Sequence, residues 1–302
     1  MKLDHQARLE LARETLAGLS VGDALGEALS YQYHRARELQ DFSAFRPGTV
    51  RFTDDTAMAL GIVECLSLCR TIDEDSLAWI FAKNFRTDPE RGYGKMARRI
   101  LTQLAEGGAW RTVSSTAFGG GSFGNGSAMR VAPLGAYFCE DLRKVRDMAA
   151  ASARVTHAHP EGIAGAVAVA VAAATATTSR LSSPEQAAGE VWESVLMMTP
   201  DGSTARGLRT ARSLPPETRP AEAARAVGCG YEVSCQDTVP FAVWNACRCL
   251  HDFREALIST VEVGGDCDTN AAIVCGIVAS YASSTDFIPD DWRKACEPLS
   301  VK

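Results

Sequence analysis

The sequence predicts an all-α protein with one domain that spans residues 1–302. Apolar residues recur at steps of three and four in several segments, which is the periodicity of a helix with one buried face. Alternating strand patterns and two-residue hairpin turns are scarce. Hydrophobic residues make up 46% of the 302 residues and charged residues 23%, a globular composition. The motifs come from both ends and the middle of the chain without an internal repeat, so a single helical domain is the simplest organisation.

Three helices are predicted in the first third of the chain. Apolar residues follow helical spacing in two segments, at Leu9, Ala12, Leu16 and Leu19 and at Met58, Ile62, Cys65, Leu66 and Cys69. Thr71 and Glu74 have the spacing of a capping box. This pattern predicts that a third helix begins at Thr71.

Further helices are predicted in the second half. Pro160 and Glu161 suit a first helical turn, so an Ala-rich helix should begin there and continue over residues 162–178. That segment is weakly apolar and short for a membrane span, which favours a buried helix. Another apolar helix is expected over residues 271–282. Val233 and residues 238–241 could be extended, although Pro240 argues against a central strand, and residues 213–220 are expected to form a surface loop.

Charge and cysteine content narrow the class of protein. Lys and Arg number 31 against 37 Asp and Glu, a net charge of −6, which gives no bulk attraction to nucleic acid or to an anionic membrane. A local basic patch remains compatible with this balance. The first residues lack the pattern of a secretory signal, and the ten cysteines include no CxxC pair. We therefore expect reduced thiols and a cytoplasmic protein.

Two acidic clusters precede predicted helices, TDDT at residues 53–56 and GGDCDT at residues 264–269. Each alone could be a helix cap, because Thr and Asp accept hydrogen bonds from free backbone amides at helix starts. If the two clusters converge, their four Asp side chains form an all-oxygen site that favours Mg²⁺, Mn²⁺ or Ca²⁺ over zinc. An EF-hand is excluded, since Ala271 and Ile277 stand where its loop needs Gly and Glu.

A glycine-rich run, GGGSFGNG, occupies residues 119–126. Its small residues would let backbone amides face an anion. It lacks the Lys of a phosphate-binding GxxxxGK[ST] loop, and its GxGxxG match has no preceding strand, so neither motif applies. A flexible loop is the alternative, but Phe123 within the run could stack on a base or ring.

Histidines and small residues supply two weaker signals. His157 and His159 form an HxH pair that could bind metal, although structural or capping roles are commoner. A third hypothesis is a neutral histidine at the wall of a pocket. The following HPE lacks the PCxxC partner of zinc deaminases. Gly18, Gly22 and Gly26 would let two helices approach closely. Asp23 lies between Gly22 and Gly26, and Glu27 follows Gly26 directly. Carboxylates on such a closely packed helix predict either a functional site or a buried hydrogen-bond network.

Taken in chain order, these segments resemble the ADP-ribosylglycohydrolase family, which includes the glycohydrolases that reactivate dinitrogenase reductase and the ADP-ribosyl-acceptor hydrolases. The segments that carry the resemblance are GLSVGDALGE (18–27), RFTDDTAMAL (51–60), RGYG (91–94), FGNGSAMRVAPLGAYF (123–138), VTHAHPEGIAGA (155–166) and VGGDCDTNAAIVCGIV (263–278). The pairing of TDDT with GGDxDT is the most specific of them. The resemblance implies an orthogonal multi-helix bundle.

The resemblance also implies a metal-dependent hydrolase that removes ADP-ribose from an ADP-ribosylated protein or nucleic acid by cleaving the bond at ribose C1″. Two Mg²⁺ or Mn²⁺ ions would be held by Thr53, Asp54, Asp55, Asp266, Asp268 and Thr269. Substrate would contact Asp23, Gly121, Ser122, Phe123, Gly124, Asn125, Gly126, Met129 and His157. Catalysis would involve Asp54, Asp55 and Glu27. No membrane is implied, and the acceptor linkage and oligomeric state stay open.

The chain departs from the family at a flap beyond the GDALG segment. Ser30 stands where several members carry a glutamate near the metals. Glu27, Glu38 in the expected flap (residues 30–47), and Asp88 or Glu90 beside the GYG segment could supply an acid instead. Two other functions therefore remain open: an ADP-ribose-binding or crystallin-like structural protein without turnover, and a different Mg²⁺-dependent nucleotide hydrolase.

Overall fold

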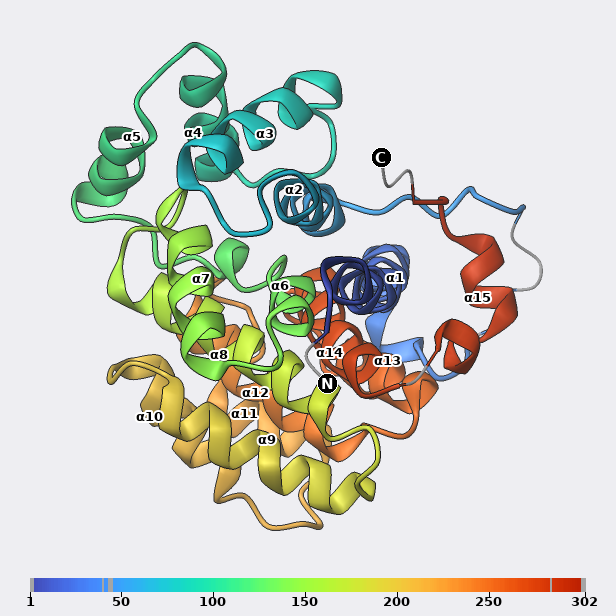
Figure 1. Cartoon of the computed structure of the whole chain (residues 1–302). Coiled ribbons are helices and arrows are strands. Elements are labelled where there is room, and N and C mark those ends of the chain that lie inside the picture. Colours follow the sequence, from blue (N-terminus) through green and yellow to red (C-terminus); the bar gives the residue numbers. More distant parts are fainter. Residues whose placement is uncertain (1–2, 40, 43–45, 283, 300–302) are drawn as a thin grey trace.

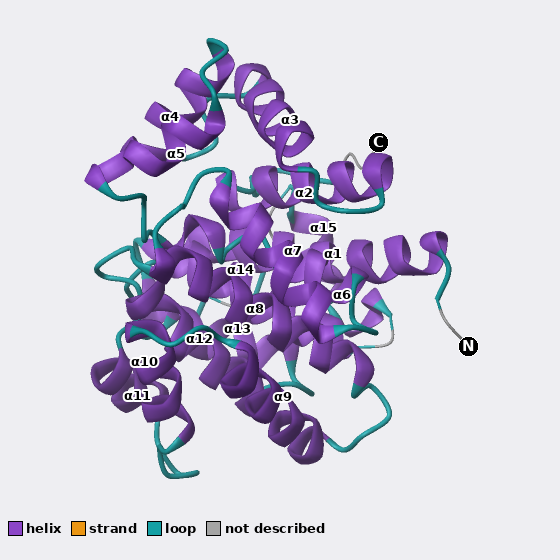
Figure 2. Ribbon diagram, turned by 60° about the vertical axis from the view of Figure 1, so that its left-hand side comes forward, coloured by secondary structure: helices purple, strands orange, loops and turns teal. Residues whose placement is uncertain are grey.

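A computed structural model describes residues 3–39, 41–42, 46–282 and 284–299. The regular structure of these residues is helical, and Figure 2 shows helices and loops throughout. The extended pairings within them are two isolated bridges, Val50 with Cys296 and Gly124 with Ser234. The predicted all-α class is confirmed.

The helices have the following bounds, with labels as in Figure 1. They are α1 (His5–Ser30), α2 (Asp54–Cys69), α3 (Glu74–Thr87), α4 (Lys95–Ala105), α5 (Trp110–Thr116), α6 (Ala132–Tyr137), α7 (Leu142–Arg154), α8 (Pro160–Thr178), α9 (Pro184–Met198), α10 (Ser203–Arg212), α11 (Pro220–Val227), α12 (Cys235–Arg248), α13 (Phe253–Val261), α14 (Cys267–Tyr281) and α15 (Asp290–Ala295). In both views α3, α4 and α5 lie at one end, and α9, α10 and α11 lie at the other. Helices α1, α6, α8 and α14 pack against one another between these ends.

Helix α1 packs closely on α14 through its three glycines. A Cβ atom on Gly18 would lie 2.4 Å from Ala279 Cβ, one on Gly22 would lie 2.4 Å from Ala271 O, and one on Gly26 would lie 2.7 Å from Cys267 O. These distances leave no space for a side chain, so the expected close helix approach is confirmed. The contact extends to the first turn of α14, where Asp268 lies.

Helix α8 is the predicted Ala-rich helix. It begins at Pro160 after His159, whose side chain accepts a hydrogen bond from the backbone amide of Glu161. Among the described residues it is the one helix long and apolar enough to cross a membrane by length and composition, and 83% of that window is buried inside the protein. Such burial is typical of the core helix of a globular fold.

Two local predictions were wrong. Helix α3 is capped by Asp73, which accepts from the amide of Ser76, and not by Thr71. Thr71 instead donates its hydroxyl to Met148 Sδ, and Asp is an equally good cap two residues later. Residues 238–241 lie inside α12 rather than in extended backbone. Pro240 lies in the second turn, where it removes one backbone donor of the helix, and its ring packs against Gly207 of α10.

The α1–α14 contact generates a stability prediction. Gly22→Ala should lower the free energy of unfolding by about 1–3 kcal/mol, because the new methyl group must push α14 away. Gly189→Ala is the matched control: Gly189 lies in α9 with nothing within 4 Å of its would-be Cβ, so alanine should stabilise the protein by about 0.5–1 kcal/mol. Urea unfolding measures both, and equal effects of the two substitutions would contradict the packing account.

Candidate functional site

The two acidic clusters lie at the starts of α2 and α14 and line one cavity of about 560 Å³. Asp54 and Asp55 begin α2, and Asp266, Asp268 and Thr269 begin α14. Helix α1 packs against both helices, so it brings together segments that are about 210 residues apart in the sequence. The partial positive charge at each helix N-terminus favours the carboxylates gathered there.

Asp23 organises the start of α2 from the middle of α1. Its fully buried carboxylate accepts hydrogen bonds from the backbone amides of Thr53 and Thr56, each at 3.0 Å, and from their hydroxyls at 2.7 and 2.5 Å. These four donors occupy the lone pairs of both carboxylate oxygens. Burial, followed by the charge of Asp268, raises the pKa of Asp23 to about 7.

The donor atoms at the floor of the cavity fit a divalent cation. One oxygen each from Asp23, Asp55 and Asp268 lies within 4.8 Å of the other two. The oxygens of Asp23 already accept from α2, so Asp55 and Asp268 are the candidate cation ligands among the three. Asp55 Oδ2 lies 3.0 Å from the Thr53 hydroxyl and shares its single proton with Asp23, whereas Asp55 Oδ1 is buried without a hydrogen-bond partner among the described residues. A buried carboxylate oxygen with no donor is costly, and a hard cation would remove that cost.

The raised pKa values of the aspartates in the two clusters also favour a bound cation. Burial and neighbouring carboxylates raise the pKa of Asp54 and of Asp266 to about 8 and hold the pKa of Asp55 well above its usual range. In Asp54 the nearby charge of Arg130 opposes this rise. Without a cation these groups would therefore retain protons near neutral pH, and a divalent ion would favour their ionised form.

The glycine loop forms a second wall of the same cavity. Its lining residues are Ser122, Phe123, Gly124, Asn125 and Gly126, joined by Met129 and His157. Asn125 Nδ2 donates to Asp266 Oδ2 at 2.6 Å and to the Thr238 hydroxyl at 3.0 Å, which ties the loop to the acidic cluster. Gly121 does not line the cavity: it has a φ of +93°, and its would-be Cβ lies 2.4 Å from His159 N, so it seats the loop against the start of α8.

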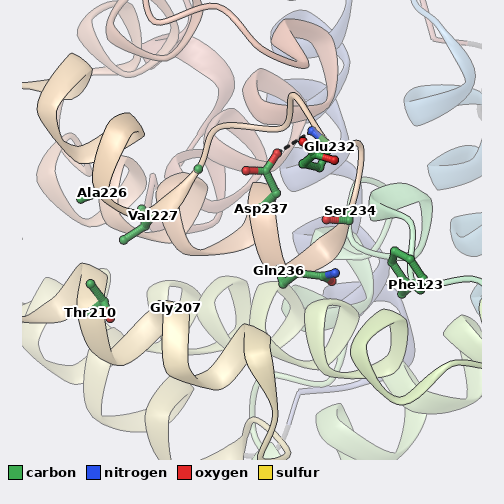
Figure 3. Close-up of a pocket in the computed structure, with 10 residues that line it drawn as sticks. Phe123, Gly207, Thr210, Ala226, Val227, Glu232, Ser234, Gln236 and Asp237 are labelled. Atoms are coloured by element: carbon green, nitrogen blue, oxygen red, sulfur yellow. Dashed lines mark hydrogen bonds between the residues drawn. The ribbon is translucent and has the colours of Figure 1, made fainter.

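Phe123 separates this cavity from a second groove of about 450 Å³ between α10, α11 and the start of α12. Figure 3 shows Phe123 at one end of that groove and Thr210 and Val227 toward the other. Its ring is 42% exposed and meets the His159 ring edge to face, with centroids 5.3 Å apart. The backbone amide of Glu232 donates to Asp237 Oδ2 at 2.8 Å along the wall of the groove.

His157 lies behind the glycine loop and is 7% exposed. Its Nδ1 is 2.7 Å from the Thr156 hydroxyl, and a Cβ on Gly126 would lie 3.1 Å from Nε2. Burial, followed by the charge of Arg130, lowers the pKa of His157 to about 3. The imidazole is therefore neutral near neutral pH and contributes no charge to the cavity wall.

The acids considered for the flap lie outside the cavity lining. Glu27 is exposed on α1, although burial and Asp268 raise its pKa, and Ser30 donates its hydroxyl to Glu27 O. Glu38 pairs with Arg35, Asp88 with Arg51 and Arg91, and Glu90 with Arg98. Residues 40 and 43–45 of the expected flap lie outside the described residues.

Several lining residues had no predicted role. The far wall is formed by residues around the GYG segment and by the loop before α12, namely Gly92, Gly94, Lys95, Met96, Glu232 and Val233. Buried Arg130 and Thr156 lie behind His157. A sequence signal existed only for Arg130, a cation inside the otherwise apolar run AMRVAPLGAYF.

Removing one acid should separate metal binding from folding. Asp55→Asn should raise the Tm of the metal-free protein by about 2–4 °C, because asparagine removes a carboxyl that burial and its neighbours force to take up a proton on folding. The same variant should lose Mn²⁺ binding. Thermal unfolding and Mn²⁺ calorimetry test both effects against Asp147→Asn, an exposed acid on α7. A destabilised variant that still binds Mn²⁺ would contradict this account of the cluster.

The raised pKa values also predict how stability depends on pH. The native protein without metal holds protons on Asp54 and Asp266 that the unfolded chain releases, so this contribution to stability should fall as pH rises from the ordinary value of 3.8 to about 8. Thermal unfolding in chelator, compared between about pH 5 and about pH 8, should show a smaller decline for Asp54→Asn than for the natural protein. Excess Mg²⁺ should reduce the decline in the natural protein. An identical decline in both proteins would show that Asp54 titrates normally.

Comparison with known proteins places this geometry in a family. The family model for ADP-ribosylglycohydrolase matches residues 4–301. The chain is 28% identical to the ADP-ribosylhydrolase ARH3 of Homo sapiens, covering 94% of this chain and 88% of the relative. It is 33% identical to an uncharacterized protein of Archaeoglobus fulgidus, and the match covers 97% of this chain and 95% of that protein. It is 25% identical to the ADP-ribosyl-[dinitrogen reductase] glycohydrolase of Rhodospirillum rubrum, and the match covers 91% of this chain and 86% of that protein.

A solved structure named as an ADP-ribosylglycohydrolase-related protein complex has the same fold. It matches with a TM-score of 0.57 and 22% identity, covering 96% of this chain and 93% of that chain. The family match extends over nearly the whole sequence and includes both acidic clusters and the glycine loop. The chain therefore belongs to the ADP-ribosylglycohydrolase family.

Proposed function

We propose that the protein is a metal-dependent hydrolase that releases ADP-ribose from an ADP-ribosylated protein or nucleic acid by cleaving the glycosidic bond at ribose C1″. The observation that carries this proposal is the single cavity shared by the two acidic clusters and the glycine loop. Family membership supports the substrate class. The names of the human and Rhodospirillum relatives describe hydrolysis of ADP-ribosyl groups.

Each part of the cavity has a role in this proposal. Thr53, Asp54, Asp55, Asp266, Asp268 and Thr269 would hold two Mg²⁺ or Mn²⁺ ions. When bound, the ions would orient the ribose hydroxyls and lower the pKa of water. Asp23 keeps Thr53 and the first turn of α2 in place through its four hydrogen bonds. The amides of Gly124 and Asn125 already donate to Ser122 Oγ and Val233 O, so other amides of the glycine loop would donate to the diphosphate, and Phe123 would offer a ring face to the base.

Proton transfer in the reaction would fall to a carboxylate at the cavity floor. Asp54 and Asp55 line the cavity and would become ionised when a cation is bound, so either can accept a proton from the attacking water. Glu27 lies one turn of α1 after Asp23 and senses the charge of Asp268, which makes it the alternative acid at the edge of the site. A nearby negative charge also stabilises an oxocarbenium-like transition state.

One observation favours a second function, ADP-ribose binding without turnover. Ser30 stands at the expected flap-acid position with its hydroxyl bonded to Glu27 O. None of Glu27, Glu38, Asp88 and Glu90 lines the cavity in the described part of the chain. A chain with this site could retain its ligand without cleaving the substrate.

Release of free ADP-ribose distinguishes the two functions. The natural protein with Mg²⁺ should release ADP-ribose from at least one member of a panel of ADP-ribosylated arginine, serine and nucleic-acid substrates, and chelator should abolish the release. Asp268→Asn should lower the rate at least about 100-fold, because it removes a charge aimed at the cation site. Asp147→Asn on the exposed face of α7 serves as the control.

Other outcomes have clear meanings. Binding of ADP-ribose by the folded, metal-loaded protein with no release from any substrate would favour the binding function. Release of AMP or phosphate from nucleotides would favour a different nucleotide hydrolase. Full activity in Asp268→Asn would contradict the assignment of the acidic clusters.

A further inference from the structure

A buried cation lies behind the glycine loop, where burial lowers its pKa overall although Asp54 is close enough to raise it. Arg130 is fully buried between the loop and α6, and its printed hydrogen bonds go to neutral groups. Its Nη2 donates at 2.9 Å both to Ser152 O and to the Thr156 hydroxyl oxygen. Its guanidinium carbon lies 4.7 Å from the centre of the Phe81 ring. Burying a guanidinium is costly, so the position of Arg130 points to a specific role.

The hydrogen bond from Arg130 determines what the Thr156 hydroxyl can do. Arginine carries only donors, so Thr156 Oγ1 must accept from it. The other hydrogen-bonding neighbour of Oγ1 is His157 Nδ1 at 2.7 Å. If Nδ1 carried a proton, Oγ1 would accept twice and its own proton would have no acceptor in the described structure. The hydroxyl therefore donates to Nδ1, which leaves Nδ1 without a proton.

The imidazole of His157 is oriented so that its Nε2 lies at the cavity wall. His157 is neutral, because burial and Arg130 lower its pKa to about 3, so its one ring proton lies on Nε2. Nε2 faces the glycine loop: Cβ atoms on Gly126 and Gly124 would lie 3.1 and 3.5 Å from it. Among the described residues Nε2 has no hydrogen-bond partner, and His157 lines the cavity. The cavity wall therefore carries an unused N–H donor beside the backbone of the loop.

We propose that Arg130 and Thr156 are positioning residues that hold His157 as its Nε2–H tautomer, so that this nitrogen donates to an acceptor oxygen of the ligand's diphosphate. The assignment of a diphosphate rests on the proposed function. The other tautomer would direct a lone pair at the phosphate and repel it. A neutral donor also suits a cavity lined by the two acidic clusters, because it would bind an anionic oxygen without adding a charge beside a cation held there.

The tautomer can be measured without substrate. In nitrogen-15 spectra of the histidine side chains of the metal-loaded natural protein, His157 should show a protonated Nε2 and an unprotonated Nδ1. The chain has five histidines, so His157→Gln assigns the signals. Thr156→Val should produce a mixture of tautomers, and Thr156→Ser, which keeps the hydroxyl, should restore the Nε2–H form. A protonated Nδ1 in the natural protein would overturn the proposal.

Calorimetry with ADP-ribose then tests the consequence for binding. Thr156→Val should weaken ADP-ribose binding about tenfold, the size of one hydrogen bond to a charged group, and Thr156→Ser should recover most of it. Adenosine, which lacks phosphates, should bind both variants equally. Unchanged ADP-ribose affinity in folded Thr156→Val would overturn the proposed donor role. Absence of ADP-ribose binding by the natural protein would instead contradict the proposed function and leave the tautomer result standing.

Discussion

Asp23 connects the parts of this protein that must meet for a site to exist. Its carboxylate is buried in the middle of α1, and it accepts four hydrogen bonds from the backbone amides and hydroxyls of Thr53 and Thr56. On the same helix, Gly22 and Gly26 bring the first turns of α14 into direct contact. One helix thereby sets the position of two acidic clusters that are distant in the chain. The positions of the aspartate oxygens at the cavity floor depend on this arrangement.

Gathering these carboxylates has an energetic cost that shapes the rest of the cavity. The helix N-termini, the hydroxyl of Thr53 and the amide of Asn125 reduce the repulsion. They do not remove it, since the pKa values of Asp54 and Asp266 are still raised to about 8 and Asp55 Oδ1 has no donor among the described residues. Binding of a cation would therefore stabilise the folded protein, because metal binding is coupled to folding.

The walls of the cavity complement its floor. The acidic floor suits a cation, and the glycine loop with His157 presents neutral donors that suit an anion. Asn125 joins the two, because one amide group bonds both to Asp266 on α14 and to Thr238 on α12. In the ligand that we propose, the ribose hydroxyls would meet the floor and the diphosphate would meet the glycine loop. This arrangement explains why the motifs occur together in one chain.

Periodicity and cap chemistry are local properties, so the sequence by itself determined the existence of α1, α2, α8 and α14 and the all-α class, although α14 begins at Cys267 and not at Ala271 as expected. It also marked the acidic clusters and the glycine loop, whose spacing carries the family resemblance. Local signals failed where neighbours compete: Asp73 displaced Thr71 as a cap, and α12 continued through Pro240. Only the tertiary structure decided that Asp23 is saturated by α2, that Gly121 supports the loop without lining the cavity, and that Arg130 and Thr156 lie behind His157. These facts depend on contacts between segments far apart in the chain, which no local pattern encodes.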